Sequence, residues 1–552
     1  MSMKLTSSDG RARPSSHAQS PPIQAASIKD GSAINSATDT ERTSDEKHSI
    51  FTKTEKWIIV SLIALAGLYS PLTANIYFPA IPALSRDFNK SVELINLTVT
   101  MYVVMQGVAP MFWGPLADRY GRRPCYLGCL TVLTLSNVGL ALVHTNAYWL
   151  LMVLRCLQAG GSASTIALGA GVIGDISTRE ERGGFFGMFT LGPMVGPVIG
   201  PVIGGAISDA LGWRALFWFL TIASAVCLLV MLLLQPETLR SIVGNGSIAP
   251  PKYNRPWLSV IPKQKPTKRP DSDAKNASPG NPFRLFLNVD IVILLVINAF
   301  TNSVMYGVIT TLSTTFESIY PFLTETTIGL CFLAYGGGMI AGSAFTGKVL
   351  DREYKSFARK AERDGDNTLR RTDTGREAIH LEKVGAVLPF QCRLDSFYIP
   401  FGQARLRLVP PCAAVFGGCV CGYGWILQRE LSIAGPLIIH FVIGYMSMAM
   451  MNSSSTLMID LFPTQASSIT ACNNLVRCTM AAVVIAVIQP IINKIGLGWT
   501  FFILGILMIL TIPLIYLEIV LGPRYRRLRF RKSRANSALE EVTEEGKKAK
   551  AP

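Results

Sequence analysis

The stretch Gly114-Pro-Leu-Ala-Asp118-Arg119 recurs in the second half of the chain as Gly347-Lys-Val-Leu-Asp351-Arg352. Each copy follows an apolar run and opens a basic segment, so one motif occupies the same place in two halves. Duplication of this kind is typical of membrane proteins built from two related helical bundles. The repeat therefore predicts an all-α integral membrane protein with two bundles.

The composition agrees with a membrane protein. Of the 552 residues, 49% are hydrophobic and only 16% are charged, whereas an average soluble domain carries about 25% charge. The charge is missing from apolar runs of roughly 20 residues, which is long enough to cross a bilayer. The twelve expected spans, six in each bundle, are 57–80, 93–115, 124–143, 147–174, 184–208, 213–235, 286–311, 326–347, 408–427, 433–460, 467–493 and 498–521.

The remaining segments are polar tails and loops. The N-terminal tail is rich in Ser, Thr and Pro and has few large apolar groups, so it cannot bury enough surface to offset its ordering entropy. The expected organisation is a disordered tail 1–54, a first bundle 55–235, a central loop 236–285, a second bundle 286–521 with an insertion 348–407, and a basic tail 522–552.

The basic residues predict the orientation of the chain. A net charge of +16 is compatible with nucleic acid, but Lys and Arg are concentrated in tails and loops between apolar spans. With twelve alternating spans, these basic segments all fall on one side, and positive loops stay in the cytoplasm. We therefore expect both termini in the cytoplasm, a lipid bilayer and no nucleic acid as partner, and a plasma membrane location, with the vacuolar membrane as an alternative.

The repeated motif also suggests a gate. Glycines permit a tight turn and close helix approach, and the carboxylate of Asp118 can meet a helix N-terminus or a neighbouring arginine. The alternative is a chance turn with a run of charges. This pattern resembles the signature loop of the major facilitator superfamily, which implies the major facilitator fold. The residues assigned to a cytoplasmic gate are Gly114, Asp118, Arg119, Gly121, Arg122, Arg123, Asp351 and Arg352.

The fourth span contains a charge in an apolar helix, Arg155, with Gln158 less than one turn further on. An arginine inside a membrane helix costs roughly 3 kcal/mol or more, so it persists where it has a partner or a role in transport. The segment resembles the arginine motif that the superfamily links to proton coupling, and it implies this role for Arg155 and Gln158. The alternative is a structural arginine bonded to backbone carbonyls.

The fifth span has glycine at every fourth residue, which leaves one helix face nearly bare for a partner helix. Prolines beside these glycines remove backbone donors and bend the helix. This span resembles the antiporter motif of drug:proton antiporters, which implies a hinge and seal; generic glycine packing is the alternative. The motif residues are Gly192, Pro193, Gly196, Pro197, Gly200 and Gly204.

Further segments narrow the resemblance, among them Tyr69–Pro79 in the first span, Pro236-Glu237-Thr238-Leu239 after the sixth, and Asn473–Arg477 in the eleventh. Together they resemble fungal twelve-span drug:proton antiporters of the quinidine-resistance type, a group that includes citrate exporters. The resemblance implies export of a small organic molecule in exchange for protons by alternating access. It implies no enzyme activity and no cofactor, and we expect a monomer.

A substrate of such a fold binds between the two halves. Polar or aromatic residues inside the spans are the candidates, although each could equally form an interhelical hydrogen bond. The candidate cavity residues are Asn75, Tyr102, Gln106, Asn298, Asn302, Tyr306, Tyr335, Asn452 and Arg477. No acidic residue is predicted in the middle of a span, so the sequence identifies no proton carrier.

Three functions remain open at this point. The first is drug, toxin or metabolite export in exchange for protons. The second is export of an organic acid such as citrate, because Arg155 and Arg477 place positive charge in the membrane and no carboxylate is predicted beside them. The third is a transporter-like nutrient receptor. No nucleophile–base pair or metal-ligand spacing points to catalysis or to a metal site.

Residues 384–403 do not fit their surroundings, because they are apolar and aromatic inside a charged loop. One hypothesis is a retained intron: a Val codon can begin with GT, a Gln codon can end in AG, and 20 residues keep the reading frame. An interfacial amphipathic segment is the alternative.

Overall fold

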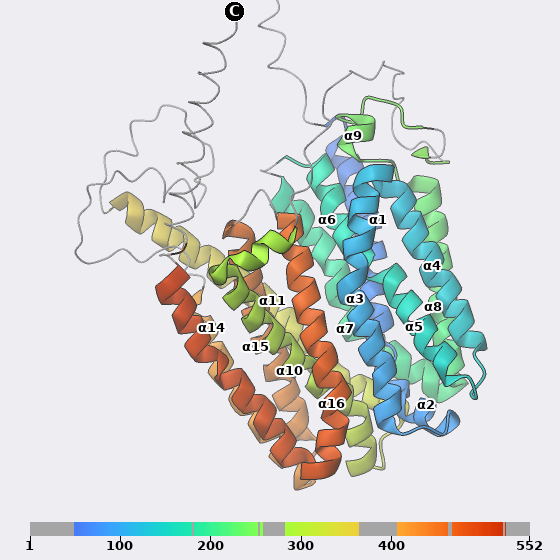
Figure 1. The fold of residues 1–552 in the computed structure, drawn as a ribbon, viewed down its shortest axis with the longest axis vertical. Helices are drawn as coiled ribbons and strands as arrows, with labels where there is room; N and C mark the ends of the chain where they lie inside the picture. Colours follow the sequence, from blue (N-terminus) through green and yellow to red (C-terminus); the bar gives the residue numbers. More distant parts are fainter. Residues whose placement is uncertain are drawn as a thin grey trace, which may run out of the picture. The chain divides into compact units, whose positions relative to one another are not determined.

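The computed structural model describes residues 49–178, 181–251, 254–257, 282–363, 406–461, 466–522 and 525. Its regular structure is helical (Figure 1). In chain order the elements are α1 Lys53–Asn75, η1 Phe78–Ala80, α2 Ile81–Asp87, α3 Val92–Tyr120, α4 Arg122–Leu142, α5 Tyr148–Ser162, α6 Ser164–Ile176, α7 Arg182–Leu211, α8 Trp213–Leu234, α9 Arg240–Val243, η3 Pro282–Leu287, α10 Val289–Ile319, α11 Glu325–Arg363, α14 Val409–Gln428, α15 Ala434–Leu461 and α16 Ala466–Ile509.

Within the described residues, 11 helical stretches are long and apolar enough to cross a membrane. The last of them, Ile469–Gly522, has 54 residues and would extend about 80 Å at 1.5 Å per residue, far more than a bilayer core of about 30 Å. Gly496 interrupts it with a non-helical φ of 82°. The break divides this stretch into two spans, so the total is twelve and the predicted fold class is confirmed.

The first span is broken as well, and it is longer than predicted. It begins at Lys53, because Thr52 and Glu55 form a reciprocal capping box at its N-terminus. After Asn75 the chain passes through the short 3₁₀ helix η1 into α2, with Pro79 and Pro82 at their first turns. Proline lacks the N–H that a continuous helix needs there, so one predicted helix becomes two helical pieces.

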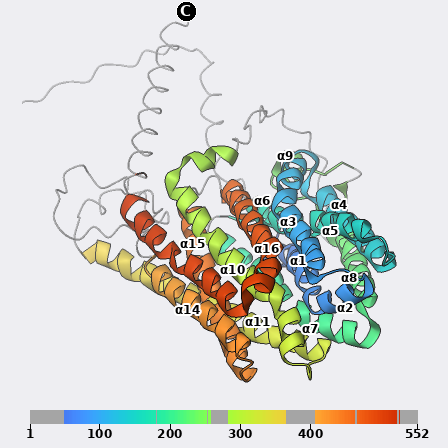
Figure 2. The ribbon, with the colours of Figure 1, turned by 60° about the horizontal axis from the view of Figure 1, so that its bottom comes forward.

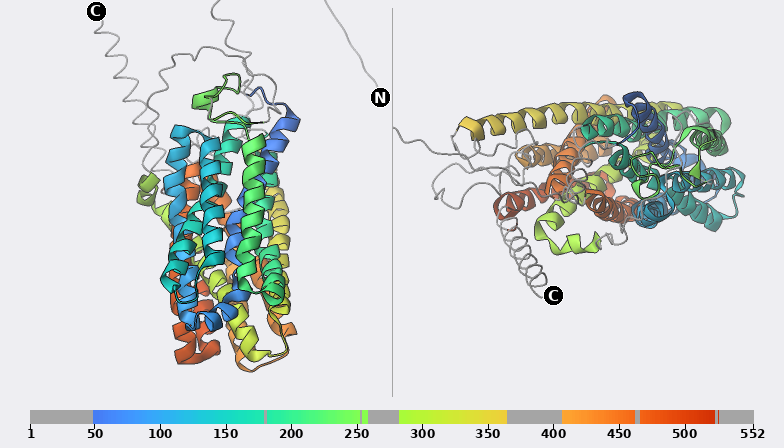
Figure 3. Two further views of the ribbon diagram at one scale, coloured as in Figure 1. Left: turned by 90° about the vertical axis from the view of Figure 1, so that its right-hand side faces the viewer. Right: turned by 90° about the horizontal axis from the view of Figure 1, so that it is seen from above.

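Helix contacts arrange these elements as two bundles. In the first half α1 packs on α7, and α4 packs on α5 and α8; in the second half α11 packs on α15, and α16 packs on α10 and α14. Two helix pairs make the most extensive contacts between the halves, α3 with α16 and α7 with α11, and smaller contacts join α6 to α16 and η1 and α2 to α10. Figures 1 and 2 both show α16 between α10 and α3, and Figure 3 shows the helices from the side and from above.

The eighth span continues beyond its predicted end at 347, because α11 runs on to Arg363. The second motif copy therefore lies inside a long helix, whereas the first copy lies in the last turns of α3, before Gly121. Residues 384–403, most of the central loop and the C-terminal tail lie outside the described residues.

Candidate functional site

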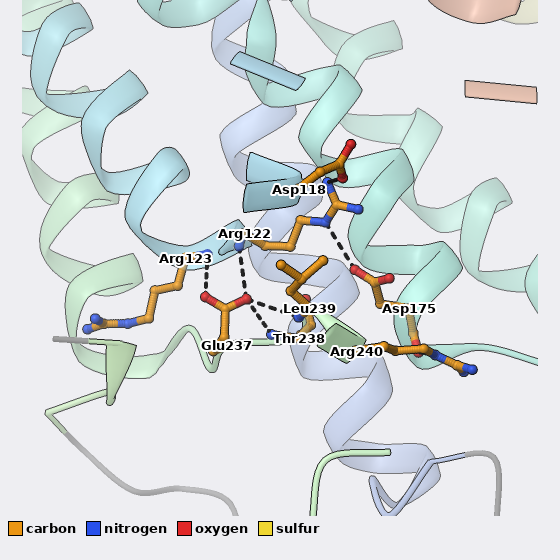
Figure 4. A network of polar contacts seen from close by, with 8 residues as sticks. All are labelled: Asp118, Arg122, Arg123, Asp175, Glu237, Thr238, Leu239 and Arg240. Atoms are coloured by element: carbon orange, nitrogen blue, oxygen red, sulfur yellow. Dashed lines mark hydrogen bonds and ion pairs between the residues drawn. The ribbon is translucent and has the colours of Figure 1, made fainter. Parts of the chain in front are cut away.

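The first motif copy ends in a helix cap made by a distant carboxylate. Gly121 has a φ of 116°, which favours glycine, and it separates α3 from α4. The carboxylate of Glu237 accepts the first two N–H groups of α4, from Arg122 at 2.8 Å and from Arg123 at 3.2 Å (Figure 4). It also accepts the N–H groups of Thr238 and Leu239, each at 3.0 Å. A buried negative charge thus satisfies the free donors of a helix N-terminus.

The arginines of the same motif bind other elements of the first bundle. Arg122 forms ion pairs with Asp118 at 2.8 Å and with Asp175 at 3.0 Å. Arg123 donates to the carbonyl oxygens of Gln235 at 2.9 Å and Leu232 at 2.7 Å, at the end of α8. The motif therefore ties together α3, α4, α6 and α8, all in the first bundle.

The structure brings only some of the predicted gate residues together. Asp118, Gly121, Arg122 and Arg123 belong to this network, whereas Arg119 contacts the ring of Tyr120 at 5.6 Å. Gly114 lies on α3 without a close neighbour across from it, Gly347 likewise on α11, and Arg352 is exposed. The position of Asp351 within α11 is described, but not its side chain.

Two residues of the network, Glu237 and Asp175, were not among the predicted gate residues. Glu237 follows directly after the sixth span, and an acid at such a place can cap a neighbouring helix N-terminus. Asp175 lies at the end of α6, where a sequence alone does not indicate which arginine it meets.

We expect Glu237→Ala to destabilise the first bundle. Four backbone N–H groups would lose a charged acceptor in a buried position, and each hydrogen bond to a charged group contributes about 1.5–3 kcal/mol. Because the freed donors can partly reach water at a loop, the expected loss is about 3 kcal/mol in total. The measurement is thermal unfolding in detergent, with Glu55→Ala as a milder control, because the Glu55 carboxylate accepts the N–H group of Thr52 at the exposed cap of α1. Equal stability of the two variants would contradict this role of Glu237.

Arg155 is fully buried in the first bundle, with an exposed fraction of 0%. Its guanidinium lies over the rings of Tyr77 at 4.2 Å and Tyr102 at 4.5 Å. Its Nη1 donates to Gln158 Oε1 at 2.6 Å and, as the structural alternative expects, to the backbone carbonyl oxygen of Thr73 at 3.4 Å. Neither its Nε nor its Nη2 has a hydrogen-bond partner among the described residues. Among the described residues no carboxylate pairs with this charge, and two aromatic faces lie against it instead.

The surroundings of Arg155 form one polar network. Gln158 donates to Asn137 Oδ1 at 2.6 Å, so the two predicted coupling residues share a chain of hydrogen bonds. The Tyr102 hydroxyl lies 2.8 Å from the hydroxyl of Ser162 and 2.6 Å from that of Thr73. Polar groups from α1, α3, α4 and α5 thus meet around a single buried cation.

Several predicted cavity residues of the second bundle also meet. Asn298 donates to Asn473 Oδ1 at 3.2 Å, and Asn302 donates to the carbonyl oxygen of Arg477 at 3.3 Å. Arg477 is half-buried and donates to Asn474 Oδ1 at 2.8 Å. These contacts join α10 to the first half of α16.

Other candidate cavity residues lie apart or face their own helices. Asn474 donates to the backbone carbonyl of Gln106 at 2.9 Å and so bridges the bundles, although Gln106 itself donates to Ser70 in its own bundle. Asn452 donates to Ser343 at 3.2 Å. The other three, Asn75, Tyr306 and Tyr335, are placed separately: Asn75 donates to its own helix, Tyr306 is half-buried on α10 and Tyr335 is buried on α11.

The glycine face of α7 packs against α1 of the same bundle. A Cβ added to Gly192 would lie 2.1 Å from the carbonyl oxygen of Ala64, and one on Gly204 would lie 2.2 Å from that of Ile76. Gly196 and Gly200 meet the same helix, between Pro71 and Ile76. The bare face predicted from the glycine spacing therefore has a close partner, and this partner belongs to the first bundle.

A salt bridge joins the same two helices where they begin. Lys56 Nζ lies 2.6 Å from Glu181, directly before α7. The hydrogen bond from Lys56 lowers the pKa of Glu181 from its usual value. A carboxyl group whose folded-state pKa is lowered adds stability above its unfolded pKa, and this contribution is lost as the pH falls through the folded value.

A different face of α7 touches the second bundle. A Cβ on Gly205 would lie 2.3 Å from the carbonyl oxygen of Glu325, and one on Gly336 would lie 2.8 Å from Val198. Further along α7, a Cβ on Gly187 meets no atom of the described chain within 4 Å. We call the end of the bundles that carries the two motif copies the motif end, and the opposite end, with Glu325, the far end.

The second helix pair between the bundles, α3 with α16, has a close contact near the middle of α3. A Cβ on Gly107 of α3 would lie 2.9 Å from Cys478 Cβ on α16. Nearer the motif end, neither Gly114 nor Gly347 has a described atom within 4 Å of such a Cβ. The tightest glycine contacts between the bundles therefore lie at the far end and in the middle, and the glycines checked nearer the motif end have open space beside them.

Two six-helix membrane bundles with buried polar groups inside them are an arrangement found in polytopic transporters. The family described as Major Facilitator Superfamily matches residues 63–361 of the chain. This chain is a member of the Major Facilitator Superfamily. The resemblance inferred from its motifs is thereby confirmed, and the family comprises transporters rather than enzymes.

Two of the proteins that are similar to this chain come from fungi. Citrate exporter 1 of Aspergillus niger is 36% identical over 511 residues, which cover 90% of this chain and 92% of that protein. MFS antiporter QDR2 of Candida albicans is 32% identical over 489 residues, covering 87% of this chain and 92% of that protein. Among solved structures, a D-xylose-proton symporter has a TM-score of 0.59 at 14% identity and covers 83% of this chain and 97% of its own; it supports the fold alone.

Proposed function

We propose that this protein exports a small organic molecule in exchange for protons by alternating access. The observation that carries the proposal is Arg155, a fully buried guanidinium with two unpartnered nitrogens among the described residues. Such a charge is expensive in a membrane, so its retention favours a role in transport over a purely structural one. Arg155 and Gln158 are proposed to take part in proton coupling.

The bundle contacts support the alternating part of the proposal. Among the described residues, the ion pairs of Arg86 with Glu317 and Glu325 join the bundles at the far end, and the closest glycine contacts between the bundles lie at that end and in the middle. If the basic loops lie in the cytoplasm, this state is open inward, and both termini are cytoplasmic. The network of Glu237 and the motif arginines stabilises the first bundle at the inward opening. We propose the plasma membrane as the location.

An organic acid is the substrate class that the charges favour. Arg155 and Arg477 both lie within the helices, and neither forms an ion pair with a carboxylate among the described residues. A cationic drug would be repelled by such a site, whereas a carboxylate would be attracted. The similarity to a citrate exporter and to a QDR2 antiporter leaves both substrate classes within the family.

A vesicle experiment tests this proposal. The full chain is reconstituted in liposomes with an acidic interior, and uptake of citrate is compared with uptake of a cationic dye. We expect citrate to accumulate faster than in empty vesicles, by about tenfold, and a protonophore to abolish the difference. If the rate of citrate uptake is the same with and without the pH gradient, the proposed exchange for protons is wrong. If only the dye accumulates, the drug-export alternative is favoured.

The same experiment addresses the nutrient-receptor alternative. A receptor signals with little net flux, so neither substrate would accumulate above empty vesicles. The long folded cytoplasmic domain expected of such a receptor would have to come from 348–407, of which the structure describes the continuation of α11 to Arg363 and the two residues before Leu408.

A further inference from the structure

The outer part of the first span carries two adjacent charges that bind in different directions. Asp87, the last residue of α2, accepts a hydrogen bond from Trp213 Nε1 at 2.7 Å, within the first bundle. Arg86 crosses to the second bundle, where it lies 2.5 Å from Glu317 and 3.5 Å from Glu325. Helix α2 is therefore anchored on its own bundle and latched to the other one.

An aromatic pair lies beside this latch, from the element that precedes α2. Phe78 of η1 stacks on Phe332 of α11 with ring centroids 6.2 Å apart and an interplanar angle of 2°. Both rings are buried, with exposed fractions of 0% and 1%. Stacked apolar rings exclude water, so this pair can seal the interface where the ion pairs, which are partly exposed, cannot.

Polar contacts continue the closure around the far end. The Thr326 hydroxyl donates to Asp209 of α7 at 2.7 Å, and Asn493 donates to Glu93 of α3. Each of these contacts joins the two bundles. Closure at this end thus uses side chains from α2, α3 and α7 on one bundle and from α10, α11 and α16 on the other.

We propose that η1 and α2 form the outer gate of the protein, with Arg86, Glu317 and Glu325 as its latch and Phe78 with Phe332 as its seal. The inference rests on the proposed alternating access and names the device that holds the inward-open state. Opening would break the Arg86 ion pairs and the phenyl stack, and it would leave the Asp87–Trp213 contact intact. The short helix η1 separates α2 from α1, so the latch and the seal lie on a distinct piece of the first span.

The strength of the latch suits a gate that opens in every cycle. Exposed ion pairs bias an equilibrium only about two- to fivefold each, because water screens them and the side chains lose freedom. The Arg86 side chain is 62% exposed. A latch of two such pairs can therefore favour the closed state without trapping the protein in it.

A labelling experiment tests the gate directly. The reporter is Ser208→Cys, because Ser208 is 5% exposed and precedes Asp209 at the closed interface. A membrane-impermeant maleimide is added outside intact cells that express the full chain, and labelling of the reporter peptide is followed by mass spectrometry, which separates it from the native cysteines. We expect Arg86→Glu to speed this labelling about threefold to tenfold, because two attractions become repulsions.

Two variants serve as controls. Lys90→Glu makes the same change of charge four residues away. The Lys90 side chain is exposed, and the bonds of this residue to Ser85 are made by its backbone, so labelling should stay unchanged. The exchange Arg86→Glu with Glu317→Arg restores one ion pair in the opposite polarity and leaves the repulsion from Glu325, so labelling should be slower than in Arg86→Glu alone but faster than in the reporter protein.

A milder variant guards against misfolding. Glu317→Gln with Glu325→Gln keeps the shape of both side chains, removes the attraction to Arg86, and should speed labelling about threefold. Unchanged labelling in this variant and in Arg86→Glu, or an equal effect of Lys90→Glu, would overturn the gate. Labelling needs neither substrate nor a proton gradient. If the variants change labelling as expected but the protein shows no flux in vesicles, the outer gate is supported and the proposed function is rejected.

Discussion

Gly192→Ala is expected to destabilise the first bundle severely, although it adds one methyl group. The new Cβ would lie 2.1 Å from the carbonyl oxygen of Ala64, 2.9 Å from its carbonyl carbon and 3.4 Å from its Cα. These are backbone atoms of α1, which cannot turn aside as a flexible side chain can, so α1 and α7 must move apart along their shared face. Overpacking of a core typically costs 1–3 kcal/mol, and a backbone clash puts this variant at about 3 kcal/mol or more.

Gly187→Ala is the matched control, because it makes the same chemical change in the same helix. Gly187 is exposed, and no described atom lies within 4 Å of its added Cβ. Alanine stabilises a helix interior by up to about 1 kcal/mol relative to glycine, so this control should be neutral or slightly more stable. Thermal unfolding in detergent, followed by size-exclusion chromatography, compares the two. Equal midpoints would contradict the tight packing of α7 on α1.

The glycine spacing illustrates what a sequence can and cannot predict. Residues four apart lie on one helix face, so the spacing alone indicates a bare face and a close partner. It carries no information on which helix fills that face. The structure places α1 there, while Val198, Pro201 and Gly205, on another face, meet α11. The spacing thus predicted a close helix partner for this face, and only the structure shows that the partner is α1 of the same bundle.

The fold itself was largely predictable, because apolar runs and a repeated motif are local signals. Contacts between charges far apart in the chain were not. Glu237 caps α4 across 115 positions, and Arg86 reaches Glu317 across 231. Both acids lie at ends of spans, where a sequence shows many exposed charges and does not pair them. Arg155 was predicted as a functional charge, but the two tyrosine rings that lie against it come from the turn after α1 and from α3.

Arg155→Met is expected to abolish transport while the protein remains folded. Methionine fills much of the same volume without the charge, and replacing a buried charge by an apolar side chain of similar size is often neutral or stabilising. The Tyr77 and Tyr102 rings would still have an apolar neighbour to pack against. If Arg155 only supports the bundle, transport should survive this substitution; if it takes part in coupling, flux driven by the pH gradient should fall about 100-fold or more.

Arg214→Met is the matched control for this prediction. Arg214 also lies over an aromatic ring, that of Trp213 at 4.3 Å, and it donates to the carbonyl oxygen of Val143 near the far end. Its removal should leave flux within about twofold, because this pair lies outside the polar network of Gln158. Arg155→Lys separates charge from shape: lysine keeps the positive charge but lacks the planar fork that stacks on two rings and reaches Gln158. Full flux in Arg155→Lys with none in Arg155→Met would assign the coupling to charge alone, and full flux in Arg155→Met would remove Arg155 from the mechanism.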